Sequence, residues 1–543
     1  MISRDEADAM PRPSPFLLEG IYPLCRVLLG TRRWKRLAVL CRRPSALPGL
    51  LEEDHRPRSA PPFVADLARI EWAVHEVGKE DIPGRHTLDR LTLNPALRLL
   101  SLKWKGIPAW MNDDRKSAVA PRRGSEVVLV WRRPESGTAI ARKALEDDLL
   151  VLKMIVEGIS PEEAAETGSI PVGAVDGALR RAAEQGILLS PPSRIRRDPA
   201  VFPAEAGEEF LVSPMFTLQW HITQACDLRC KHCYDRSRRS PLNMKTALRV
   251  LDELRDFCRE RFVGGQVSFS GGNPLLYPKF LDLYRAAVDR GFPVVILGNP
   301  APREMIGQIV AIEKPAAFQV SLEGLETHND RIRGRGTYRR ALEFLDLLRE
   351  FGVYSMVMLT LTGDNLGQVL PLAEILRDRA DLFTFNRLSK AGEGAALALP
   401  GQADYIGFLG EYLEAAEKNP VLGLKDNLLN IFCRAHGEGV FGGCTGYGCG
   451  AAFNFLTLLP DGEVHACRKF PSPIGNIRES SLAQIYDSEP AHRYRSGSQA
   501  CLGCPIRAVC GGCLASAYSS GLDVLAHRDP YCFIDANSCS SDR

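Results

Sequence analysis

The sequence predicts an α/β protein whose central domain is a partial barrel of six strand–helix repeats. A small winged-helix-like module precedes this barrel, and a cysteine-rich domain follows it. Three observations support the prediction. Strand-like and helix-like segments alternate between residues 214 and 400, which is typical of a parallel sheet. Cysteines gather at 226–233 and again after residue 444. A chain of 543 residues is also too long for one compact core.

The expected domains are 1–120, 124–197, 214–400 and 401–543. Residues 1–120 combine apolar helical stretches with segments rich in proline and arginine, and they carry no motif with recognisable chemistry. We assign them to an N-terminal region of unknown role. A proline-rich linker at 190–203 separates the second domain from the third.

The segment 124–197 shows a winged-helix pattern. The expected elements are a strand at 126–131, helices at 139–157, from 160 and at 175–185, and a wing strand at 187–189. One face of the first helix is expected to carry the apolar residues Leu145, Leu149, Leu152 and Val156. Ser160 and Glu163 form a capping box at the start of the second helix.

This pattern resembles the leader-peptide recognition domains attached to enzymes that modify ribosomally made peptides. Such domains bind the leader by adding its strand to the edge of their own sheet. A purely structural winged-helix domain is one alternative, and a DNA-binding domain is another. Glutamates are interleaved with the arginines of this segment, which argues against a surface that follows phosphates.

The barrel is expected to contain strands at 216–223, 267–270, 293–297, 317–322, 353–361 and 383–385, alternating with helices such as 243–261, 278–290 and 337–351. The first of these helices places Leu248, Leu251, Leu254 and Phe257 at three-residue steps on one face. Chemistry in barrels of this kind lies at the C-terminal ends of the strands. The motifs described next all fall there.

The segment Cys226-Asp-Leu-Arg-Cys230-Lys-His-Cys233 follows the first strand. Its three thiolates can hold three irons of a four-iron cluster, which normally takes four cysteine ligands. The fourth iron is then open to a substrate or a cofactor. Zinc sites usually show paired CxxC knuckles or histidine ligands. Three cysteines within such a short segment also fit a disulfide scaffold poorly. We therefore interpret the motif as a cluster site.

A CxxxCxxC motif after the first strand resembles the radical S-adenosylmethionine (SAM) superfamily, over roughly residues 214–535. The resemblance implies that the open iron chelates SAM and that an electron cleaves SAM to a 5′-deoxyadenosyl radical, which abstracts a hydrogen from substrate. It implies a catalytic role for Cys226, Cys230 and Cys233. It also places His232 in the role of the aromatic residue before the last cysteine.

Gly271-Gly-Asn-Pro274 follows the second strand, where that family usually has Gly-Gly-Glu-Pro in contact with the SAM amino group. The resemblance makes Gly271 and Gly272 residues that let the backbone approach the ligand. Asn273 replaces the usual glutamate. Its side-chain oxygen can accept a hydrogen bond, but it lacks the charge of a carboxylate toward an ammonium group.

Ser321-Leu-Glu-Gly324 follows the fourth strand and resembles the Ser-Leu-Asp-Gly segment of peptide-modifying members. By this resemblance Ser321 would contact polar groups of SAM, and Arg333 would pair with the SAM carboxylate. Asn299 and the segment 392–394 fit the rim of the same site.

The last third of the chain carries Cys444, Cys449, Cys467, Cys501, Cys504, Cys510, Cys513 and Cys532. This arrangement resembles the SPASM domain, the auxiliary-cluster domain of radical SAM maturases. Eight cysteines suffice for two fully ligated four-iron clusters, and two zinc knuckles are the alternative. The family order assigns Cys444, Cys449, Cys467 and Cys513 to the auxiliary cluster nearer to the SAM site. It assigns Cys501, Cys504, Cys510 and Cys532 to the auxiliary cluster farther from that site.

Two departures from that family are visible. Cys510 and Cys513 have two residues between them where the family usually has three, which leaves the partition between the clusters open. Arg468 follows the third cysteine, where sulfatase-maturing relatives have an aspartate. This departure argues against formylglycine formation.

The composition excludes several function classes. With 68 basic and 66 acidic residues, the chain has no overall charge that favours nucleic acid. It has no apolar run long enough to span a membrane and no secretory signal. Its many cysteines, in iron–sulfur-like spacings, favour a reducing cytoplasm.

Together these features predict a radical SAM enzyme that modifies a ribosomally made precursor peptide, for example by a thioether or another oxidative crosslink. The expected cofactors are SAM, a [4Fe–4S] cluster at the SAM site and two auxiliary [4Fe–4S] clusters. The expected partners are the precursor peptide, whose leader residues 124–197 would bind, and an electron donor such as flavodoxin or ferredoxin. The alternatives are a maturase of a larger protein or cofactor, and a non-enzymatic redox-sensing regulator that binds DNA.

Overall fold

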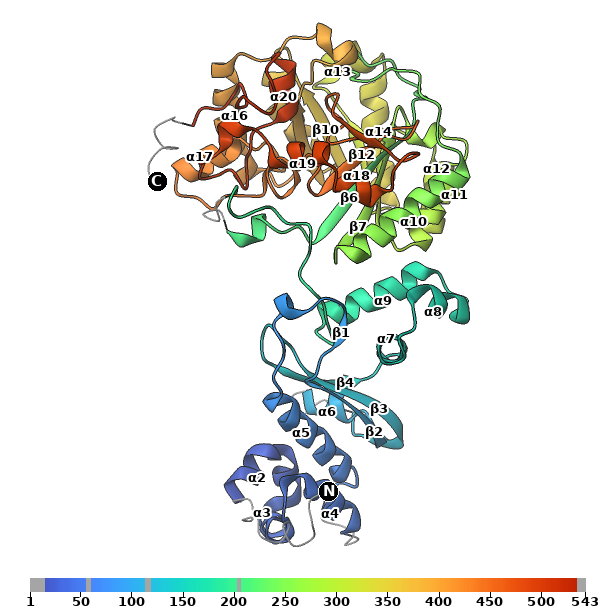
Figure 1. Ribbon diagram of the computed structural model, residues 1–543, viewed down its shortest axis with the longest axis vertical. Coiled ribbons are helices and arrows are strands. Elements are labelled where there is room, and N and C mark those ends of the chain that lie inside the picture. The colour runs from blue at the N-terminus through green and yellow to red at the C-terminus, as the bar shows by residue number, and fades with distance from the viewer. Residues whose placement is uncertain (1–14, 55–59, 113–118, 203–206, 535–543) are drawn as a thin grey trace. The chain divides into compact units, whose positions relative to one another are not determined.

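The computed structural model describes residues 15–54, 60–112, 119–202 and 207–534 (Figure 1). The chain divides into two compact units, residues 1–192 and 193–543. Each unit is described by itself.

The first unit is built on a three-stranded antiparallel sheet in the order β2-β3-β4. Its strands are β2 (Leu97–Lys105), β3 (Arg122–Arg132) and β4 (Ala139–Lys143). The helices before and between the strands are α2 (Pro15–Ile21), α3 (Pro23–Leu40), α4 (Leu47–Glu53), α5 (Val64–Lys79) and α6 (Ile107–Asn112). Buried residues of α3 and α5 share one core with the inner face of β2 and β3.

A second core in this unit joins the sheet to α7 (Glu146–Glu157), α8 (Pro161–Gly168) and α9 (Val172–Glu184). Ser160 is the N-cap of α8, as predicted, because its hydroxyl accepts a hydrogen bond from the Glu163 N–H at 3.1 Å. The wing strand β5 (Leu188–Leu189) pairs with β1 (Thr92–Leu93), which lies outside the predicted module.

The helix predicted at 139–157 is wrong in two respects. Residues 139–143 form strand β4, which pairs with β3, and the helix begins only at Glu146. The predicted apolar face is also mostly exposed, since Leu145, Leu149 and Val156 are 54%, 39% and 70% exposed. The face formed by Asp148, Val151 and Leu152 is buried instead. Asp148 can be buried because Arg142 neutralises it.

The second unit contains the predicted six parallel strands. They are β6 (Met215–Thr223), β7 (Gly264–Gly271), β8 (Val294–Leu297), β9 (Ala317–Ser321), β10 (Ser355–Leu361) and β11 (Leu382–Arg387). Each pairs in parallel with its neighbour in chain order. The predicted partial barrel is therefore confirmed.

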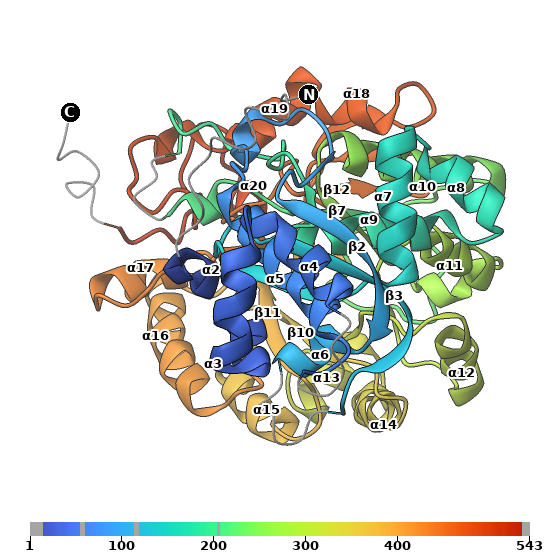
Figure 2. The same ribbon diagram turned by 90° about the horizontal axis from the view of Figure 1, so that it is seen from below.

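Helices cover the outside of this sheet (Figure 2). They are α10 (Met244–Glu260), α11 (Phe280–Asp289), α12 (Arg303–Ile312), α13 (Glu326–Arg333), α14 (Thr337–Glu350), α15 (Val369–Leu376) and α16 (Gln402–Lys418). The side chain of Asn243 caps α10 by accepting a hydrogen bond from Thr246 N–H. Leu251, Leu254 and Phe257 of α10 are buried against the sheet, as its apolar periodicity predicts.

The C-terminal segment continues the barrel sheet. Strand β12 (Phe455–Leu458) pairs in parallel with β6, and β13 (Glu463–His465) and β14 (Pro473–Asn476) follow it in antiparallel order. The remaining helices are α17 (Leu429–Ala435), α18 (Leu482–Tyr486), α19 (Glu489–Ser496) and α20 (Leu514–Ser519). This shared sheet fixes the C-terminal cysteines relative to the barrel. No helix in the described residues is long and apolar enough to cross a membrane.

Candidate active site

A cavity of about 440 Å³ lies at the carboxyl ends of the barrel strands. Its lining draws on the loop after β6, which carries Cys226, Cys230, His232 and Cys233. Gly271 and Gly272 after β7, Asn299 after β8, Ser321 at the end of β9 and Thr360 in β10 also line it. Residues separated by more than 100 positions therefore face one space, as expected for a parallel barrel.

The structure brings the three cysteines of the CxxxCxxC motif together. The loop has little regular structure, and its Cys233 N–H donates to the Cys230 carbonyl at 3.2 Å. Burial raises the pKa of the Cys230 thiol to about 11, and the neighbouring Cys226 and Cys233 add to the rise while Arg333 opposes it. A metal that binds the Cys230 sulfur must therefore displace its proton.

His232 points a ring nitrogen at the carboxylate of Glu323, with 3.3 Å between Nε2 and Oε1. Burial lowers the pKa of this histidine, which favours the neutral ring. If Nε2 carries the proton, Nδ1 is an acceptor, and this buried atom has no hydrogen-bond partner within the described part of the chain. A bound ligand with a donor group would satisfy it.

Gly271 and Gly272 are held against the backbone of the cysteine loop. The Gly272 N–H donates to the Thr223 carbonyl at 2.9 Å, and the Asn273 N–H donates to the Ala225 carbonyl at 2.7 Å. A Cβ on Gly272 would lie 2.3 Å from the Ala225 carbonyl oxygen. Gly271 has a φ of 138°, a conformation that favours glycine. No larger residue fits here without moving the loop.

We therefore expect Gly272→Ala to lower the rate of SAM cleavage about 100-fold, because the added methyl group pushes the Cys226 loop away from its place. Formation of 5′-deoxyadenosine by the reconstituted chain measures this effect. Gly367→Ala is the matched control, since a Cβ there meets nothing within 4 Å. Equal rates for the two variants would contradict the prediction.

Asn273 is 4% exposed and does not line the cavity. Its amide nitrogen donates to the Asp227 carboxylate at 3.0 Å, and its oxygen accepts from Leu275 N–H at 3.3 Å. Asn299 donates to the same Asp227 oxygen at 2.7 Å. The residue in the glutamate position thus orients a carboxylate from the cysteine loop. Sequence reasoning missed Asp227, although it directly follows Cys226.

Arg333 and Ser321 both line the cavity. Arg333 already donates to Glu323 at 3.2 Å and to Asn299 at 3.1 Å. Glu323 is 1% exposed and also accepts from Thr360 N–H at 2.8 Å. The Glu323 carboxylate therefore joins the ends of three strands and orients both His232 and Arg333.

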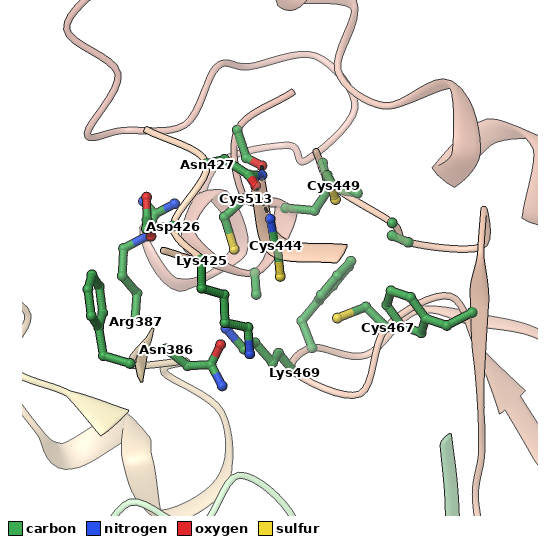
Figure 3. Close-up of a pocket in the computed structure, with 18 residues that line it drawn as sticks. Asn386, Arg387, Lys425, Asp426, Asn427, Cys444, Cys449, Cys467, Lys469 and Cys513 are labelled. Carbon is green, nitrogen blue, oxygen red and sulfur yellow. Dashed lines mark hydrogen bonds and ion pairs between the residues drawn. The ribbon is translucent and has the colours of Figure 1, made fainter. Parts of the chain in front are cut away.

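A second cavity, of about 70 Å³, is lined by Cys444, Cys449, Cys467 and Cys513 (Figure 3). Burial raises the pKa of Cys449 to about 12, and Cys513, Cys467 and Cys444 contribute to the rise. The Asn427 side chain holds the backbone at Cys444 in place by accepting a hydrogen bond from the Cys444 N–H at 2.7 Å. The four sulfurs are the set that the family order assigns to the nearer cluster.

A third cavity, of about 20 Å³, is lined by Cys501, Cys504, Cys510 and Cys532. The short spacing between Cys510 and Cys513 is accommodated by Gly511 and Gly512, whose φ angles are 61° and 67°. Two consecutive left-handed glycines turn the chain sharply, so the cysteines on either side face different cavities. Cys539 lies outside the described residues. Within the described ranges, no group of three or more His, Cys, Asp or Glu side chains converges on a single metal ion.

Comparison with known families agrees with this geometry. The model for the radical SAM superfamily matches residues 220–376, and the model for SPASM, an iron–sulfur cluster-binding domain, matches residues 449–505. The chain therefore contains a radical SAM domain and a SPASM domain. SAM and [4Fe–4S] clusters are the cofactors of these domains, and the three cysteine-lined cavities provide thiol donors for such clusters.

Several curated proteins are similar to this chain. An AdoMet-dependent heme synthase of Methanosarcina barkeri is 27% identical, over 58% of this chain and 95% of its own. The mycofactocin maturase MftC of Mycobacterium ulcerans is 28% identical, over 60% of this chain and 90% of its own. The subtilosin biosynthesis protein AlbA of Bacillus subtilis is 24% identical, over 55% and 67%.

Among solved structures, Streptococcus suis SuiB bound to S-adenosylmethionine covers 75% of this chain and 96% of its own, at 18% identity and a TM-score of 0.48. The family models match only residues in the second unit. The role of the first unit therefore has to be inferred from its own structure.

Proposed function

We propose that this enzyme cleaves SAM reductively and uses the resulting radical to modify a ribosomally made precursor peptide. One observation carries the proposal. We call the cavity at the carboxyl ends of the barrel strands, next to Cys226, Cys230 and Cys233, the SAM-side cavity. It shares the lining residues Asn386, Arg387 and Lys469 with the cavity of Cys444, Cys449, Cys467 and Cys513. A substrate between the two cavities can therefore react on one side and pass an electron to the other.

The residues of the site divide this work. Cys226, Cys230 and Cys233 hold the cluster at which SAM binds, and they are the catalytic residues of the proposal. Gly271, Gly272, His232, Ser321 and Arg333 line the space for SAM. Asn273 lies outside this lining and orients Asp227. When bound, SAM and its cluster supply a radical that removes hydrogen, and the protein binds, orients and excludes water.

The two four-cysteine cavities would hold auxiliary [4Fe–4S] clusters with the partition described above. Both are enclosed by buried residues of the C-terminal segment. The nearer one lies beside the substrate space and is the proposed electron acceptor. The enzyme also needs a source of electrons for SAM cleavage, and we propose a flavodoxin or ferredoxin for this role.

The proposal of a peptide substrate is based on the similar proteins. Two of them are named for the maturation of mycofactocin and the biosynthesis of the bacteriocin subtilosin. We further propose residues 124–197 as the leader-binding module, in which strand β3 pairs with β2 of the region 1–120. The barrel at 214–400 and the SPASM domain at 401–543 are the other proposed domains. The edge strand β4 offers a place where a leader strand can add.

A second candidate is the maturation of a cofactor, favoured by the similarity to a heme synthase over 95% of that protein. A neighbouring small open reading frame for a precursor peptide would favour the first candidate, and its absence the second. The alternative of a non-enzymatic, DNA-binding regulator is not favoured, since both matched domains belong to SAM-dependent iron–sulfur chemistry.

Anaerobic reconstitution tests the proposal. We expect about twelve irons per chain, from three four-iron clusters, and 5′-deoxyadenosine after addition of SAM and dithionite. About four irons with 5′-deoxyadenosine would remove the auxiliary clusters from the proposal. A full iron count without 5′-deoxyadenosine, even with the candidate precursor peptide added, would contradict SAM cleavage.

A further inference from the structure

The SAM-side cavity is strongly basic. Its described lining includes Arg229, Arg236, Arg333, Arg387, Arg468 and Lys469, whereas Asp235 is the only Asp or Glu in that lining. The Asp235 carboxylate is already engaged, since it accepts from Gln224 Nε2 and from Ser237 N–H, both at 2.8 Å. Which of these cations could bind a ligand therefore depends on whether each one already has an acidic partner in the protein.

Several of these cations are neutralised within the protein. Arg333 is paired with Glu323 at 3.2 Å. Arg387 is paired with Asp529 at 2.7 Å and with Asp426 at 2.9 Å. Arg236 lies 3.9 Å from Glu393, and Arg229 is exposed to solvent.

Arg468 and Lys469 differ from the others. Both side chains are half-buried, and neither has an acidic partner among the described residues. The backbone directly after Lys469 is held in place, because the Ser389 hydroxyl donates to the Lys469 carbonyl. Half-buried cations without a counter-charge are costly, which is why such groups are usually paired. Their arrangement thus indicates an anion that is supplied by a ligand.

The auxiliary cluster, with its four thiolates, is itself an anion. Lys425 lines only the cluster cavity, Lys469 lines both cavities, and Arg468 lines only the SAM-side cavity. Figure 3 shows the amine ends of Lys425 and Lys469 in the space below the Cys444 sulfur. Lys425 can therefore offset the cluster charge, but Arg468 faces the substrate space and is left for a different anion.

We propose that Arg468 and Lys469 form a carboxylate-binding site that selects a substrate with an acidic group beside the carbon that reacts. This inference rests on the proposed function and names the substrate class as a carboxylate-bearing peptide. The guanidinium of Arg468 offers a bidentate fork for a carboxylate, and Lys469 adds a point charge. The carboxylate comes from an Asp or Glu side chain or from the C-terminus of the peptide.

Binding of small probes to the reconstituted full-length chain, with SAM present, tests this site. The probes are N-acetyl-aspartate N-methylamide, its asparagine analogue of the same shape, and N-acetyl-alanine with a free carboxylate. Saturation-transfer NMR measures the dissociation constant of each. We expect the aspartate probe or the N-acetyl-alanine probe to bind at least about tenfold more tightly than the asparagine probe, because charge-assisted hydrogen bonds are lost in the neutral analogue. The tighter of the two acidic probes identifies the source of the carboxylate.

The variant R468Q/K469Q should abolish that preference, and R238Q is the matched control. Arg238 is exposed, lies in the segment after Cys233 and does not line the cavity. Equal binding of acidic and neutral probes by the unmodified chain would overturn the inference, and so would a preference that survives in R468Q/K469Q.

A parallel assay of 5′-deoxyadenosine and iron on the same unmodified preparation separates the two proposals. Normal SAM cleavage without acid preference overturns only the carboxylate site. Absence of SAM cleavage, even with the candidate precursor peptide added, overturns the proposed function and this inference with it. A third outcome, in which R468Q/K469Q no longer binds SAM, would assign these cations to the carboxylate of SAM and would also overturn the inference.

Discussion

Replacing Cys226 with alanine is expected to reduce 5′-deoxyadenosine formation to the background level. Cys226 lines the SAM-side cavity, and the Asn299 amide lies 3.7 Å from its sulfur. With only two thiolates left in the motif, the four-iron cluster loses one of its three protein ligands. We expect iron to fall by about four per chain, because the two auxiliary clusters keep their own cysteines.

Cys258→Ala is the matched control for this prediction. Cys258 lies in α10 within the same barrel and is 4% exposed, and its sulfur contacts the hydrophobic core. Removing it should lower stability by about 1–3 kcal/mol through a small cavity, while iron content and SAM cleavage stay normal. Undiminished 5′-deoxyadenosine in the Cys226→Ala chain would refute the assignment of this motif.

The barrel could be predicted because its signals are local. Each strand is a short apolar run, and the helices repeat apolar residues every three or four positions. The cysteine motifs are also local, so their positions after β6 and in the C-terminal segment could be read directly. The cap at Ser160 was predictable for the same reason, since a capping box involves residues only three apart.

The parts that could not be predicted depend on contacts between distant segments. The pairing of β12 with β6 joins residues more than 200 positions apart, and no periodicity reports it. The role of Asp227 depends on Asn273 and Asn299, which reach it from the ends of two other strands. The exposed face of α7 was misjudged because Asp148 is buried as the partner of Arg142, and a pattern of apolar residues does not reveal such pairs.

The largest stability effect is expected at Arg387, where the barrel meets the C-terminal segment. Its guanidinium donates to both Asp529 oxygens, at 2.8 and 2.7 Å, and its Nε lies 2.9 Å from Asp426. The Arg387 and Asp529 side chains are only 5% and 1% exposed. Asp529 also accepts from Cys513 N–H at 2.8 Å, so the pair fixes a proposed cluster ligand.

Arg387→Met leaves two buried carboxylates without their counter-charge, and removing one partner of a buried ion pair costs about 3–5 kcal/mol. We expect the free energy of local opening at the Cys513 amide to fall by that amount, as measured by hydrogen exchange on the full-length chain. Iron at the nearer auxiliary cluster should fall in parallel. The triple variant Arg387→Met, Asp426→Asn, Asp529→Asn removes the charges together and should recover part of the loss, because no unpaired charge remains. If the triple variant is no more protected than Arg387→Met, the loss comes from packing and not from charge, and the ion pair does not hold the two segments together.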